Sequence, residues 1–101
     1  MSAATLYRYR AKIRFNLDDV EGGRKAYSDA LNVFEEFPNV VAFPNWVDGA
    51  QAHTHNVWAE AEASHQSCKN AWHHLSEAEK IVGQDTSSST AYVKSLCPES
   101  A

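Results

Sequence analysis

The feature that most constrains this chain is a stripe of apolar and small side chains that steps by three or four residues. That spacing places side chains on one face of an α-helix. Its members are Trp46, Ala50, Thr54, Val57, Ala61, Ser64, Cys68, Trp72, Leu75, Ala78 and Val82. The stripe predicts a single helix of about ten turns that stops at Gly83. The alternative is a break between Ser64 and Ser67, because so long a helix would overhang shorter neighbours.

Two shorter helices are expected before this stripe. One runs over residues 5–16, and one face of it carries Leu6, Tyr9, Ile13 and Leu17. The other runs over residues 19–37. Asp18 and Glu21 resemble a capping box at its start, and Pro38 ends it.

We therefore expect an all-α fold, a three-helix bundle with a long third helix, over residues 1–83. Residues 84–101 begin with a polar run and are expected to form a linker with a short terminal helix or a disordered tail. The third helix is longer than the first two can cover, so a partner protein is expected to cover the excess. Trp46 and Trp58 lie on or beside the stripe and are candidate partner contacts, because aromatic residues are enriched at interfaces.

Charge is distributed unevenly along the chain. The formal net charge is −4, which argues against a nucleic-acid-binding protein. Six of the nine basic residues nevertheless lie in the first quarter, at positions 8, 10, 12, 14, 24 and 25. This asymmetry indicates either a basic end that meets an acidic partner or a solvated helix face. No apolar run is long enough to span a bilayer, so we expect no transmembrane segment.

Motifs for catalysis are absent: the sequence has no Gly-rich phosphate loop, nucleophile elbow or HExxH. We expect neither an enzyme nor a bound cofactor. Glu62 and His65 match the Glu-x-x-His pattern of di-iron bundles, but only one copy is present, so a metal-binding bundle is only an alternative. Cys68 and Cys97 lack metal-site spacing. They are expected to be thiols, or to form a bridge in an oxidising compartment.

Leu6, Tyr7 and Arg8 open the first expected helix, and this tripeptide resembles the signature of the LYR-motif family. Members of that family are small three-helix mitochondrial proteins, accessory subunits of respiratory complex I or assembly factors, and they typically bind an acyl carrier protein. The resemblance covers about residues 5–40 and extends to a downstream phenylalanine, Phe34. It implies that Leu6, Tyr7, Arg8, Arg24, Lys25 and Phe34 lie near the carrier-protein contact.

The expected function is therefore that of a non-catalytic accessory or assembly subunit, on the matrix side of the mitochondrial inner membrane or in the cytoplasm. Two alternatives stay open. One is a free-standing binding module or inhibitor of phage or pathogen type that docks through its long helix. The other is the metal-binding bundle around His65.

Overall fold

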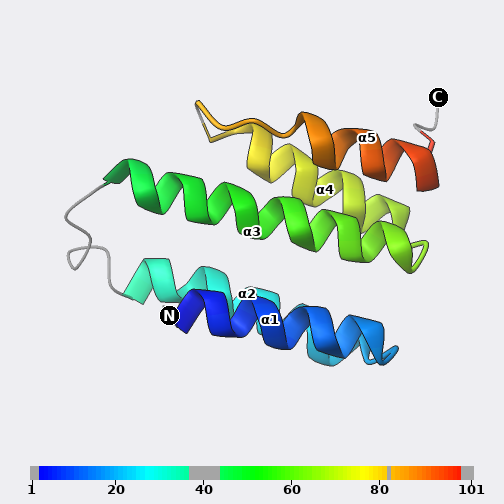
Figure 1. Cartoon of the computed structure of the whole chain (residues 1–101), viewed down its shortest axis with the longest axis horizontal. Coiled ribbons are helices and arrows are strands. Elements are labelled where there is room, and N and C mark those ends of the chain that lie inside the picture. The colour runs from blue at the N-terminus through cyan, green and yellow to red at the C-terminus, as the bar shows by residue number, and fades with distance from the viewer. Residues whose placement is uncertain (1–2, 37–43, 82, 99–101) are drawn as a thin grey trace. The chain divides into compact units, whose positions relative to one another are not determined.

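A computed structural model of the chain describes residues 3–36, 44–81 and 83–98, without the side chains of residues 35–36 and 44–47 (Figure 1). All regular structure in these residues is α-helical, which confirms the all-α prediction. The three-helix bundle with a long third helix is wrong, because the described residues form five helices. These are α1 (Ala3–Asn16), α2 (Val20–Glu36), α3 (Pro44–Ser64), α4 (Cys68–Glu79) and α5 (Ser87–Leu96).

The chain divides into two compact units, Met1–Val47 and Asp48–Ala101. The first contains the α1–α2 hairpin. The second contains α4, α5 and all but the first turn of α3. The sequence had placed the only boundary at Gly83.

A tight turn joins α1 to α2. Asp18 has a left-handed backbone (φ 63°), its amide bonds to the Phe15 carbonyl, and the Asp19 amide bonds to the Arg14 carbonyl at 2.8 Å. This pair of bonds is a Schellman motif. The N-cap of α2 is therefore Asp19, whose Oδ1 accepts the Gly22 amide at 3.0 Å. The capping box predicted from Asp18 begins one residue too early.

In the hairpin, α1 packs on α2 through small side chains and three aromatic rings. The buried residues are Ala4, Ala11, Phe15, Ala26, Tyr27, Ala30 and Phe34. A Cβ at Gly23 would overlap the Phe15 ring and lie 3.2 Å from the Ala11 carbonyl oxygen, so the glycine allows close approach of the helices. Ala4, Ala11 and Phe15 are therefore the buried side of α1, and the predicted face of Leu6, Tyr9, Ile13 and Leu17 forms on the opposite, exposed side.

In the second unit, the long predicted helix is broken at residues 65–67, as the alternative allowed. Gln66 has φ 61°, its amide bonds to the Ala63 carbonyl, and the Ser67 amide bonds to the Glu62 carbonyl at 2.9 Å. This second Schellman motif ends α3 without a glycine. The chain can then reverse, so that α4 packs on α3 instead of extending it.

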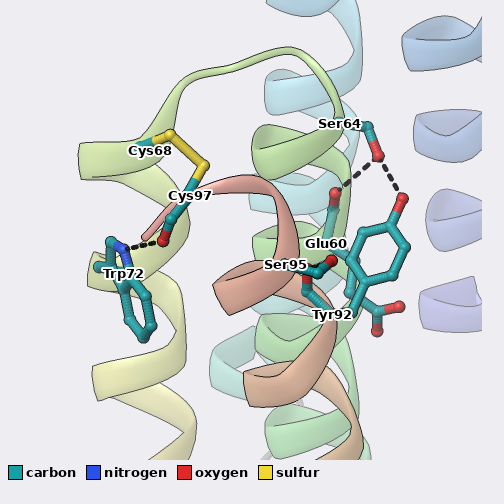
Figure 2. Close-up of a disulfide and its surroundings, with 7 residues drawn as sticks. All are labelled: Glu60, Ser64, Cys68, Trp72, Tyr92, Ser95 and Cys97. Carbon is teal, nitrogen blue, oxygen red and sulfur yellow. Dashed lines mark hydrogen bonds between the residues drawn. A yellow bond between two sulfur atoms is a disulfide. The ribbon is translucent and has the colours of Figure 1, made fainter. Parts of the chain in front are cut away.

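The core of the second unit joins α3, α4 and α5. Its buried members are Ala59, Ala63, Ala71, Leu75, Val93 and Cys97. A disulfide links Cys68 at the start of α4 to Cys97, which follows α5, and Trp72 donates its Nε1 hydrogen to the Cys97 carbonyl at 3.2 Å (Figure 2). The bridged alternative for the two cysteines is therefore the one that the structure shows. The predicted terminal helix also forms, as α5, and it supplies part of this core.

Two hydrogen bonds add to the attachment of α5 to α3. Ser89 Oγ donates to Glu60 Oε2 at 2.9 Å. The Ser64 hydroxyl lies 2.7 Å from that of Tyr92, as Figure 2 shows. The segment after Gly83 is thus tied to α3 by polar contacts as well as by Val93.

Candidate functional site

The most conspicuous surface feature of the first unit is a row of large apolar side chains on α1. Leu6, Tyr9, Ile13 and Leu17 are 55%, 57%, 58% and 75% exposed. Their spacing of three and four residues places them on one helix face. Exposed apolar residues scattered singly are ordinary, whereas a contiguous row is typical of an interaction surface.

These four residues line a shallow groove, which we call the α1 groove. Its remaining lining residues are Arg10, Arg14 and Asp19, and its volume is about 490 Å³. A smaller hollow of about 280 Å³ is also lined by Arg10 and Arg14, together with Lys25 and Asp29 of α2. The two arginines therefore lie between an apolar groove and a polar hollow.

Two of the three charged residues that line the α1 groove, Arg10 and Arg14, are positive, and the third is Asp19. Helix α1 carries Arg8, Arg10, Lys12 and Arg14 and has no acidic residue. The Arg10 guanidinium lies 5.5 Å from the centre of the Tyr7 ring. At the far end of the groove Arg14 Nη1 bonds to Asp19 Oδ2 at 2.9 Å. This bond, with the Gly22 amide, lowers the pKa of the Asp19 carboxyl, so that Asp19 stays ionised at neutral pH.

The residues that the sequence assigned to one partner contact lie in different environments in the structure. Leu6 lines the α1 groove, while Tyr7 and Arg8 beside it are only partly exposed. Arg8 donates to Thr5 Oγ1 at 3.1 Å, and burial lowers the pKa of its guanidinium. Phe34 is buried at 7% exposure.

None of the other four predicted contact residues lines the α1 groove. Of these four, Lys25 lines the neighbouring hollow. Arg24 pairs with Glu21 at 2.9 Å, and Lys25 pairs with Asp29 at 3.1 Å. Trp46 lies in the first turn of α3, and its side chain is outside the described part of the structure. Trp58 belongs to the second unit, where its Nε1 donates to Glu62 at 2.9 Å.

The sequence placed Tyr9, Ile13 and Leu17 with Leu6 on one face of the first expected helix, but of the four it named only Leu6 as a partner contact. A usable signal was present: Ala4 and Ala11 share the opposite face of α1, and small residues permit close helix packing. Arg10 and Arg14 were noted only as part of a basic cluster.

Within residues 3–36, 44–81 and 83–98, no group of three or more His, Cys, Asp or Glu side chains is placed to hold a metal ion. In the same ranges no helix is both long and apolar enough to cross a bilayer. Comparison with protein-family models, curated proteins and solved structures found no match to this chain.

Proposed function

We propose that this chain is a non-catalytic helical subunit that binds an acidic partner protein through the α1 groove. The observation that carries the proposal is the row of four exposed apolar side chains on a helix whose only charges are positive. Covering the row removes apolar surface from water, which stabilises a complex by roughly 25 cal/mol per Å². The basic side chains then select a partner of opposite charge.

The charges favour a separate acidic protein over a second copy of this chain. In a dimer formed through two α1 grooves, the basic residues of both copies would face each other, and like charges in an interface are costly. A partner that offers an apolar helix face with acidic edges would instead meet Leu6 and Ile13 with its apolar residues. It would meet Arg10 and Arg14 with its carboxylates, a pairing to which guanidinium groups are geometrically suited.

An anionic membrane is the other surface that a basic, partly apolar helix can meet. The end of the groove argues against it, because Asp18 is exposed and the ionised Asp19 lines the α1 groove. The negative formal charge of the whole chain also opposes approach to anionic lipid.

An acyl carrier protein is the specific partner that the LYR resemblance implies, and it has the required acidic helical surface. We propose it as the first partner to test, with Leu6, Arg10 and Ile13 as the contact and with Arg8 supporting the helix from a half-buried position. The accessory role in a mitochondrial respiratory complex is part of the same proposal. The matrix location stays a prediction, and the disulfide argues against it, because bridges persist mainly in oxidising compartments.

The inhibitor alternative relied on a long third helix as its docking surface. Since that helix ends at Ser64 and reverses into α4, no continuous ten-turn face exists for such a partner. The α1 groove is the better-supported docking surface in the described residues.

Binding of purified acyl carrier protein, carrying its phosphopantetheine arm and a medium-length acyl chain, tests this proposal by titration calorimetry. We expect micromolar binding that weakens with salt. Arg10→Glu and Ile13→Ser should each weaken binding about tenfold or more, because a fold-change of ten corresponds to 1.4 kcal/mol. Lys69→Glu, which changes an exposed charge in the second unit, is the matched control and should bind like wild type.

Two outcomes would overturn parts of this scheme. Equal binding by Arg10→Glu and wild type would remove the α1 groove from the interface. Binding to phosphatidylserine vesicles, without binding to the carrier protein, would replace a protein partner with a membrane.

A further inference from the structure

A cluster of imidazole and indole rings lies between α3 and α4 in the second unit. The Trp58 and His74 rings stack with centroids 3.8 Å apart and planes 20° apart. His55 Nδ1 lies 3.2 Å from His74 Nδ1. His74 is only 8% exposed, whereas histidine is a residue of intermediate burial on average.

The contact between the two Nδ1 atoms limits how many protons the pair can hold. A hydrogen bond at this distance needs one nitrogen that carries hydrogen and one that offers a lone pair. With both rings neutral, the tautomers can satisfy this requirement. When both rings are protonated, two N–H groups and two positive charges face each other, and the contact cannot persist.

The neighbouring groups do not supply enough negative charge to hold those protons. His73 packs edge-on against His74 at 5.0 Å, and its charge would oppose protonation, as would that of His55. Glu62 and Glu77 favour protonation. However, Glu62 accepts the Trp58 hydrogen bond, and Glu77 pairs with Lys80 at 3.0 Å. Burial is the largest influence on both histidines, and with the nearby imidazoles it lowers the pKa of His74 to about 4 and also lowers that of His55.

We propose that His55, Trp58 and His74 form an acid-sensitive contact, which fixes α4 on α3 at neutral pH and loosens it in mildly acidic solution. This inference is independent of the α1 groove and of any partner protein. A histidine in the unfolded chain titrates near 6.5, whereas His74 in the folded chain stays neutral down to about 4. Between those values the unfolded state binds more protons, so stability is complete above about pH 6.5 and falls as the pH drops toward 4.

Thermal unfolding at pH 7.5 and pH 5.0 tests the contact. His74→Phe preserves a ring against Trp58 and removes the titrating group. Lowering the pH from 7.5 to 5.0 should lower the Tm of wild type. We expect this fall in Tm to exceed that of His74→Phe by at least about 5 °C. His73→Gln is the matched control at the adjacent, exposed position, and it should keep most of the wild-type fall. An equal fall in wild type and His74→Phe would overturn the proposal.

A second measurement keeps the inference testable if His74→Phe does not fold. An NMR titration of the five imidazole rings in wild type should show His74, and to a smaller extent His55, titrating below the exposed histidines. The Trp58 indole N–H signal should move with the His74 titration. Five rings that all titrate near 6.5, in a chain that is still folded, would show that no acid-sensitive contact exists.

Discussion

At the scale of the residue, Gly23 shows how a single missing side chain sets the spacing of the α1–α2 hairpin. A Cβ there would lie 2.7 Å from Phe15 Cε2 and 3.2 Å from the Ala11 carbonyl oxygen. The Phe15 ring is 2% exposed and the Ala11 oxygen belongs to the backbone, so neither can move aside at low cost.

We expect Gly23→Ala to destabilise the protein by about 1 kcal/mol. Overpacking costs roughly 1–3 kcal/mol, and the gain in helix propensity offsets about 1 kcal/mol of it. Gly22→Ala is the comparison, because its Cβ would meet the side chains of Arg14 and Asp19, which are about half exposed and can turn into solvent. Urea unfolding measures the free energy of unfolding of both variants, provided that their m-values are unchanged. The Gly22→Ala protein should be the more stable of the two. A Gly23→Ala protein as stable as wild type would mean that α1 lies farther from α2 than described.

At the scale of the element, the break between α3 and α4 requires Gln66 to adopt a left-handed backbone conformation, which is strained for a residue with a side chain. Gln66 has φ 61°, where a side chain costs roughly 1 kcal/mol and glycine costs nothing. We expect Gln66→Gly to stabilise the chain by about 0.5–1 kcal/mol. Gln66→Val should destabilise it, because a β-branched side chain suits this conformation least. Chemical denaturation midpoints that shift in opposite directions would confirm the break, whereas a stabilised Gln66→Val would favour a continuous helix.

The same residue explains why the sequence predicted the elements unevenly. The start of helix α2 was placed to within a residue, because the acidic residues at positions 18–21 are a strong local signal for a helix N-terminus. The end of α3 lacks a glycine, and small or apolar residues continue at helical spacing through Ser64 and Cys68. Periodicity therefore favoured one long helix, because a glutamine at the left-handed position of the break is not a recognisable stop signal.

The candidate sites were predictable to different extents for similar reasons. Leu6 and the basic residues of α1 were found from sequence, and the apolar row was placed on one helix face, but its exposure was not predicted. Both faces of α1 are apolar, one through alanines and one through larger residues, so periodicity alone could not tell which face packs on α2. The His55–His74 contact was not predictable, because it exists only once the chain reverses at Gln66.

At the scale of the whole molecule, each unit has about 50 residues, which is small for a domain that depends on its hydrophobic core alone. The buried cores are also rich in alanine, which contributes little apolar area per residue. The two units differ in what can stabilise them besides their small cores. The second has a disulfide, whereas the first has no cysteine and leaves large apolar side chains of α1 exposed, which is consistent with a bound partner.

The disulfide restricts the unfolded chain of the second unit. It joins residues 29 apart in sequence, and closing a loop of that length in the unfolded chain is worth roughly 3–4 kcal/mol in the chain-entropy model. The double variant Cys68→Ser/Cys97→Ser should therefore lose about 3 kcal/mol of stability. Because the bridge connects only α4 and the end of α5, we expect amide hydrogen exchange to rise mainly over residues 68–97. Residues 3–36 should change little if the units unfold separately, and Lys94→Ser, an exposed change in α5, is the control. Equal acceleration in both units would instead show that the chain unfolds as one cooperative body, and unchanged exchange would show that the bridge contributes nothing to the fold.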